Sequence, residues 1–136
     1  MQRKLARENA FILIFESVCK KEETAEEIFE KATEVRGLEY DDYVKTVFFG
    51  SYENSAVIGA AMEKHFKGWK IERVSPVSMA ILRLACYEIM FMEDIPHRVS
   101  INEAIELSKK YDEEKSYAFV NGVLNAVARD FSESNG

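Results

Sequence analysis

The residues from Val77 to Leu124 constrain the fold of this chain more than any other stretch. They hold three segments whose apolar residues recur every three or four positions, which is the spacing of one face of an α-helix. The first segment carries this stripe at Val77, Ile81, Leu84, Ala85, Ile89 and Met92. Ser75 and Pro76 precede it; serine can cap the free amides of a helix start, and proline at the first helical position loses no hydrogen bond. The pattern predicts a helix that begins after Ser75.

The second segment follows Pro96, which ends whatever precedes it. Ser100 and Glu103 have the spacing of a capping box, in which the serine oxygen accepts from the third helical amide and the glutamate reaches back. Lys109 and Lys110 are favourably placed near the negative end of such a helix. We therefore expect a helix from residue 101.

The third segment contains two conflicting signals. Asn121-Gly122 between apolar runs is typical of a β-hairpin, whereas a continuous helical stripe is formed by Phe119, Val120, Val123, Leu124 and Val127. The alanines nearby favour a helix. Local rules thus favour a helix and leave the hairpin open. In a helix, Gly122 would mark close contact with another helix.

Glu88 interrupts the apolar stripe of the first segment, seven residues after Ile81. A catalytic carboxylate would need a second acid or base near it, and the sequence indicates none. We expect Glu88 to form a structural ion pair or hydrogen bond, with Arg83 or with a neighbouring helix.

The rest of the chain is also helical in pattern. Residues 2–18 predict a first helix, and a capping box at Thr24–Glu27 starts a second one that Gly37 ends. The core face of the second helix is expected at Ile28, Phe29, Ala32 and Val35. A long third helix is expected from Asp41 or Asp42 to about Phe66, and the glycines inside it, Gly50 and Gly59, indicate close approach of another helix.

These elements define the fold class. The chain has 136 residues, enough for one domain with a real core, and no strand pattern, repeat or linker divides it. We expect an all-α, compact single-domain bundle of six or seven helices. Residues 1–131 would form the domain, and residues 132–136 a disordered tail.

Several function classes lack their motifs. There is no Gly-rich phosphate loop, no HExxH, no paired-cysteine motif and no nucleophile elbow, so no enzyme and no cofactor is expected. His65 and His97 lack ligand spacing, and no metal is expected. Cys19 and Cys86 are isolated on apolar segments and are expected to be buried thiols. No apolar run reaches the roughly 20 residues that span a bilayer, so no membrane contact is expected and the location should be the cytoplasm.

The net charge of −6 is unevenly distributed along the chain. Residues 1–21 carry five bases and two acids, residues 22–63 three bases and eleven acids, and residues 64–73 four bases and one acid. Arg3 and Arg7 are one helical turn apart and, with Lys4, would form a small cationic face able to meet phosphates. Tyr111 and Tyr117 are aromatic residues near lysines and could stack on unpaired bases. Two solvated faces and peripheral core packing are the ordinary alternatives.

Four strings together resemble one family: KLARENAFILIFE, VSMAILRLACYEIMF, IPHRVSINEAIELSKKY and SYAFVNGVLN. In this order they are similar to the NusB family of bacterial transcription antitermination factors. The resemblance implies an all-helical fold, including a helix at Asn121-Gly122. It also implies a heterodimer with NusE, a small-subunit ribosomal protein. This pair would bind the single-stranded boxA element of ribosomal RNA leader transcripts and help RNA polymerase read through terminators.

The resemblance also implies which residues make contacts. RNA-binding residues would be Arg3, Lys4 and Arg7 in the first helix and Glu114, Lys115, Ser116 and Tyr117 before the last one. The surface that meets NusE would lie near Phe15, Glu72 and Ser78. The chain departs from the common family pattern in a thinner N-terminal basic run and in Phe15, where tyrosine is frequent. It also has Lys115 and Ala118 at positions where aspartate and lysine are often found.

Two further readings stay open. NusB-like domains also occur as RNA-binding accessory parts of rRNA cytosine methyltransferases, although no methyltransferase sequence follows here. A protein-interaction module without RNA binding is the other alternative. The family resemblance also allows a homodimer.

Overall fold

The structure is a computed structural model that describes the backbone of residues 1–135 and the side chains of residues 1–132. Within this part of the chain every regular element is a helix and no strand is present, so the all-α prediction is confirmed. Its elements are α1 (Arg3–Cys19), α2 (Ala25–Glu30), η1 (Lys31–Val35), α3 (Asp42–Glu53), α4 (Ser55–Glu63), η2 (Ile71–Arg73), α5 (Pro76–Phe91), α6 (His97–Tyr111) and α7 (Ser116–Asn135).

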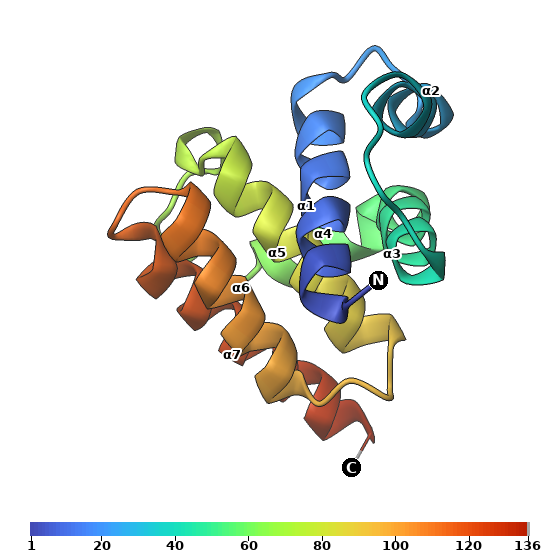
Figure 1. Cartoon of the computed structure of the whole chain (residues 1–136). Coiled ribbons are helices and arrows are strands. Elements are labelled where there is room, and N and C mark those ends of the chain that lie inside the picture. Colours follow the sequence, from blue (N-terminus) through green and yellow to red (C-terminus); the bar gives the residue numbers. More distant parts are fainter. Residues whose placement is uncertain (136) are drawn as a thin grey trace.

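Helix α5 is the centre of the bundle, and ten of its sixteen residues are buried. Helix α1 packs against both α3 and α5, while α6 and α7 pack against α5 and against each other. Figure 1 shows α2 and α3 on one side of α1 and the α6–α7 pair on the other. The core is contiguous, and its largest fully buried apolar side chains include Leu13, Phe48, Ile58, Ile81, Leu82 and Leu124. None of the helices in the described range is long and apolar enough to cross a membrane.

Two of the expected helix starts are confirmed. The Thr24 hydroxyl accepts from the amide of Glu27, whose carboxylate accepts from the amide of Thr24, so the capping box is complete. The Ser75 hydroxyl accepts from the amide of Ser78 at 3.0 Å, with Pro76 at the first helical position. Each cap satisfies a backbone donor that the first helical turn would otherwise leave free.

The expected start at Asp41 is confirmed, because its side chain accepts from the amide of Val44 at 3.0 Å. The expected single helix up to residue 66 is wrong, because it breaks at Asn54 into α3 and α4. The Asn54 side-chain amide donates to the carbonyl of Gly50 at 2.9 Å, a local bond that competes with the helical ladder. The Ser100 capping box is also wrong. Helix α6 starts earlier, at His97, so Ser100 lies inside it and its hydroxyl points to Glu88.

Three glycines were expected to mark close helix contact, and one of them, Gly59, would place a Cβ 3.0 Å from Glu63 of its own helix and 3.7 Å from the Arg83 side chain of α5. A Cβ on Gly50 would lie 2.5 Å from the ring of Tyr87 on α5, so this glycine permits α3 and α5 to approach. A Cβ on Gly122 would meet nothing within 4 Å. Gly122 is simply part of α7, which also resolves the hairpin alternative.

Other expectations differ in detail. Val35 is largely exposed, because the chain after Glu30 widens into the π-type turn η1 and rotates this side chain outward. Cys86 is buried as expected, but Cys19 ends α1 and is exposed. The backbone of residues 132–135, expected to be a disordered tail, continues α7, and Gly136 lies outside the described residues.

Candidate nucleic-acid interface

The N-terminal helix brings Arg7 into the protein interior. The Arg7 Nε donates to Glu88 Oε2 at 2.8 Å and its Nη2 to Glu88 Oε1 at 3.3 Å, while Nη1 donates to Glu103 at 3.3 Å. Arg7 is 6% exposed and Glu88 1% exposed. Burial alone would lower the pKa of Arg7, but the hydrogen bond and charge of Glu88 outweigh it and raise this pKa above its ordinary value. The guanidinium is therefore held as a cation between α1, α5 and α6.

The Glu88 carboxylate accepts hydrogen bonds from two further side chains. The Tyr43 hydroxyl from α3 donates to Oε2, and the Ser100 hydroxyl from α6 donates to Oε1 at 2.7 Å. Burial first, and then the Glu88 carboxylate, raise the pKa of Tyr43, so its hydroxyl stays protonated and remains a donor. The expected structural role of Glu88 is confirmed. Its partners come from three neighbouring helices, and Arg83 instead bonds to Ser55.

Arg3 and Lys4 are the cations of α1 that remain exposed. The guanidinium carbon of Arg3 lies 4.3 Å from the ring centroid of Tyr43. Because Tyr43 is fixed by its bond to Glu88, its ring supports Arg3 in one orientation. The expected cationic face thus consists of Arg3 and Lys4, and Arg7 lies behind it.

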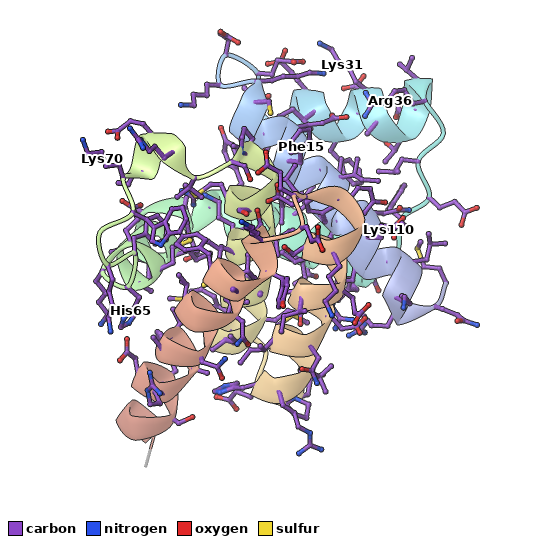
Figure 2. The ribbon with its side chains drawn as sticks, turned by 90° about the vertical axis from the view of Figure 1, so that its left-hand side faces the viewer. Phe15, Lys31, Arg36, His65, Lys70 and Lys110 are labelled. Atoms are coloured by element: carbon purple, nitrogen blue, oxygen red, sulfur yellow. The ribbon has the colours of Figure 1, made fainter. Side chains whose placement is uncertain are left out.

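A surface of cations and aromatic rings continues from α1 across α6 to α7. Lys110 binds Glu8 of α1 at 2.9 Å and lies 5.3 Å from the ring centroid of Tyr111. Lys109 lies 5.3 Å from the ring centroid of Tyr117 at the start of α7. We call the surface formed by Arg3, Lys4, Lys109, Lys110, Tyr111 and Tyr117 the cationic–aromatic surface. Figure 2 shows Lys110 beside α1 in this region.

The residues expected to continue the RNA site lie at the α6–α7 junction. Glu114, Lys115 and Tyr117 are exposed, and Ser116 is the half-buried first residue of α7. Lys115 and Ser116 also line a cavity of about 320 Å³ whose other walls include Trp69, Arg73, Asp112 and Phe119. The structure therefore brings this group next to a recess with aromatic and cationic walls.

Asp112 fixes this junction to the start of α5. Its Oδ2 accepts from the Ser75 hydroxyl at 2.8 Å and from the Ser78 hydroxyl at 2.5 Å, and its Oδ1 accepts from the amide of Glu113. Burial alone would raise the pKa of Asp112, but these hydrogen bonds, that of Ser78 foremost, hold it below its ordinary value. The Asp112 carboxylate thereby anchors the α6–α7 junction to the N-terminus of α5.

The three expected partner residues are not equivalent in the structure. Glu72 is exposed on η2 and lines a groove of about 540 Å³ between α1, α3, α4 and α5. Phe15 is half-buried on α1, and Figure 2 shows it between the connector that carries Lys70 and the helix end that carries Lys110. Ser78 is 3% exposed and donates a hydrogen bond to Asp112, so it supports the α6–α7 junction from the protein interior.

The groove beside Glu72 is mixed in character. Apolar walls are provided by Ile14, Val18, Ile71, Val74, Pro76 and Met79. Ser51 also lines it, and its buried hydroxyl has no hydrogen-bond partner in the described structure. An apolar groove that contains an unsatisfied hydroxyl suits a protein segment that supplies both an apolar side chain and a polar group.

This arrangement can bind but offers no visible chemistry. Among the residues that the structure describes, no group of three His, Cys, Asp or Glu side chains could hold a metal ion. His65 pairs with Asp130 at 2.7 Å, away from the cationic–aromatic surface. The helical fold and this surface define a class of small helical proteins whose exposed cations and rings are suited to nucleic acid.

The family is shown by comparison with known proteins. The model of the NusB family matches residues 4–129, and the chain belongs to this family. It is 45% identical to the transcription antitermination protein NusB of Clostridium botulinum strain Kyoto, over 93% of this chain and 99% of the relative. It is 40% identical to the protein of the same name from Clostridium acetobutylicum, over 98% of this chain and 99% of the relative.

Solved structures agree. The chain superposes on T. maritima NusB with a TM-score of 0.83 at 34% identity, covering 96% of this chain and 92% of that one. It superposes with a TM-score of 0.82 on a chain from a crystal structure of the antitermination factors NusB and NusE in complex with dsRNA. That match has 29% identity and covers 94% of this chain and 96% of the other. The family resemblance read from the sequence strings is confirmed.

Sequence reasoning missed two contributors to the surface. Lys109 was read only as a cation near the helix end, and its position over Tyr117 depends on how α6 and α7 cross. Tyr43 follows the helix start expected at Asp41 or Asp42, and no local signal indicates that it supports Arg3. The one signal in the sequence that could have indicated this surface is the pair Lys109 and Lys110 at the end of α6, followed closely by Tyr117 at the start of α7.

Proposed function

We propose that this protein binds single-stranded boxA-type RNA of ribosomal RNA leader transcripts as a heterodimer with NusE, and that the pair promotes read-through by RNA polymerase in the cytoplasm. The observation that carries this proposal is the cationic–aromatic surface that joins α1, α6 and α7. A similar chain is solved with NusE and dsRNA, which supports RNA and NusE as the partners. The function is one of binding, without catalysis.

The mechanism follows from the chemistry of the exposed groups. Arg3, Lys4 and Lys115 would meet phosphates, and Tyr117 would stack on an unpaired base, with Glu114 and Ser116 at the edge of the same site. Arg7 would act as a positioning residue, since it holds α1 against α5 and α6 beneath Arg3. These cations are few on a chain with a net charge of −6, so a basic partner would complete the affinity.

NusE would occupy the groove beside Glu72. Glu72 offers a charge on the rim, the groove offers apolar walls, and Phe15 extends the apolar area along α1. Ser78 would contribute by fixing Asp112 and so the shape of the α6–α7 junction. RNA and partner would then bind to neighbouring surfaces and stabilise each other's placement.

The test is fluorescence anisotropy with a labelled boxA-type single strand, titrated with this protein alone and together with NusE. A scrambled strand and a boxA duplex serve as controls, and each titration is done at two salt concentrations. Binding that is tighter with NusE, selective for the boxA strand and weakened by salt supports the proposal. Absence of binding in every mixture would favour an interaction module without RNA. Sedimentation of the protein alone in the same buffer measures any homodimer that competes for the surface.

A further inference from the structure

A second groove lies on the other side of α1 from α6 and α7, between α2–η1 and α3 (Figure 1). Its volume is about 560 Å³, and it is lined chiefly by Glu26, Phe29, Glu30, Glu34, Tyr40 and Phe49. None of these residues belongs to the cationic–aromatic surface or to the groove beside Glu72. The antitermination function proposed above makes no use of it.

The floor of this groove is aromatic. The rings of Phe29 and Tyr40 lie 4.9 Å apart, edge to face, and those of Phe29 and Phe49 lie 5.2 Å apart. Tyr40 is 48% exposed although it is large and aromatic. In an edge-to-face pair the edge of one ring meets the face of the other, and a ring face that stays uncovered attracts cations.

A cation of the protein itself already lies over these rings. The ammonium of Lys45 is 5.9 Å from the ring centroid of Phe29 and 6.0 Å from that of Tyr40. Lys45 also lines the groove and is exposed. Its flexible side chain occupies the place that a partner's lysine or arginine could take, so it shows which kind of group the rings accept.

One wall of the groove carries unpaired negative charge. Glu26, Glu30 and Glu34 follow one another at intervals of four residues, and none of their carboxylates forms an ion pair in the described structure. The neighbouring cations are engaged elsewhere, because Lys31 pairs with Glu23 and Arg36 pairs with Glu16. The helix dipole favours Glu26 in the first turn of α2, but like charges at this spacing disfavour a helix, so helix stability does not explain the whole row.

We propose that this groove binds a basic segment of a partner protein. One arginine or lysine side chain displaces Lys45 from the rings of Phe29 and Tyr40, and further basic side chains pair with Glu26, Glu30 and Glu34. The Cβ atoms of residues four positions apart on an α-helix, such as Glu26 and Glu30, lie roughly 5–6 Å apart, and alternate side chains of an extended chain lie roughly 6.6 Å apart. The matching partner is therefore an extended segment with a basic residue at every second position.

The experiment uses the full chain and a fluorescein-labelled peptide in which serine and arginine alternate over seven residues. Anisotropy gives the affinity, and amide chemical shifts in ¹H–¹⁵N spectra locate the site. We expect shifts confined to α2, η1, α3 and the connection between η1 and α3 that carries Tyr40. Tyr40→Ala should weaken binding about threefold to fivefold, and Glu26→Gln, Glu30→Gln and Glu34→Gln together at least tenfold. Lys45→Ala should tighten binding about threefold because it vacates the rings.

Matched variants separate this site from general charge attraction. The triple variant Glu53→Gln, Glu93→Gln and Glu113→Gln changes the net charge equally, and Lys70→Ala matches Lys45→Ala; each should alter binding less than twofold. Circular dichroism confirms that all variants fold.

Three results would overturn the proposal. One is equal binding of a peptide with leucine in place of arginine, which would make the groove an apolar site. Another is equal weakening by the two triple variants, which would reduce the effect to net charge. The third is a set of α2 and α3 shifts that depends on protein concentration without peptide, which would assign the groove to a second copy of the chain. Because boxA binding is measured separately, failure here leaves the antitermination proposal intact.

Discussion

The guanidinium of Arg7 and the carboxylate of Glu88 meet at 2.8 Å in the protein interior, although 81 residues separate them in the chain. This pair joins the N-terminal helix to the central helix, and Tyr43, Ser100 and Glu103 extend it to α3 and α6. A buried ion pair of this kind repays its desolvation only when all its polar atoms have partners. The pair therefore fixes how α1, which carries Arg3 and Lys4, sits on the rest of the bundle.

Removing one member of this pair should strongly destabilise the protein. We expect Arg7→Met to lower the free energy of unfolding by about 3–5 kcal/mol, because Glu88 is left buried without its main counter-charge. The double variant Arg7→Met with Glu88→Leu should lose less than the sum of the two single variants. Urea unfolding followed by circular dichroism measures all three. Strict additivity would show that the two residues do not stabilise the fold as a pair.

The exposed cations of α1 should control the salt dependence of RNA binding. Arg3→Gln and Lys4→Gln should each weaken binding of a boxA strand and reduce the slope of log K against log salt by up to about one, as expected for loss of a phosphate contact. Lys31→Gln is the control, since it removes one exposed positive charge from η1, which is not part of the cationic–aromatic surface. Anisotropy at four salt concentrations gives the slopes. An unchanged slope for Arg3→Gln and Lys4→Gln would remove α1 from the interface.

Gly50 and Gly122 should respond in opposite ways to the same substitution. Gly50→Ala places a Cβ 2.5 Å from the Tyr87 ring and should cost about 1–3 kcal/mol through displacement of α3 from α5. Gly122→Ala meets no atom within 4 Å and should stabilise α7 by about 0.5–1 kcal/mol, because alanine loses less conformational entropy in a helix. Thermal and urea unfolding measure both. A change in the free energy of unfolding that has the same sign for the two variants would contradict the packing described for them.

The parts of the fold that could be predicted from the sequence depend on local signals. The stripe of α5 and the caps at Thr24 and Ser75 were readable because their periodicity and side-chain chemistry act within one or two turns. The break at Asn54 was not predicted, because a polar residue inside a long apolar pattern is compatible with either outcome. Ser100 had the right spacing for a cap but bonds to Glu88 instead, a contact between helices that local spacing cannot reveal.

In the candidate site, too, local signals predict some features and contacts between helices decide the others. Arg3 and Lys4 belong to the cationic face that was expected on the first helix, and the family resemblance identified the α6–α7 junction. The burial of Arg7 did not follow, because it depends on Glu88 and Glu103 converging from two other helices. Spacing along one helix shows which side chains share a face, and only tertiary packing decides which of them reaches solvent.

Acid should weaken the junction that Asp112 holds. Because hydrogen bonds from Ser78 and Ser75 lower the pKa of Asp112 in the folded state, this carboxylate contributes stability above the ordinary aspartate pKa of about 3.9, and the contribution is lost as pH falls through the lowered folded value. We expect Asp112→Asn to be less stable than the native chain at pH 7, with a difference that shrinks steadily below about pH 4. Urea unfolding from pH 3 to pH 7 measures this difference.

Ser78→Ala is the companion variant, since it removes the largest of these hydrogen bonds and keeps the carboxylate. Ser78→Ala should lose part of the stability that Asp112→Asn loses at pH 7. Its stability difference from the native chain should also shrink in acid, because protonation of Asp112 removes the charge that strengthens the hydrogen bond. A stability difference for Asp112→Asn that stays constant down to pH 3 would mean that the pKa of Asp112 is the same in the folded and unfolded chains. The α6–α7 junction would then be held by packing around Phe119 and Trp69, whose rings lie 5.1 Å apart.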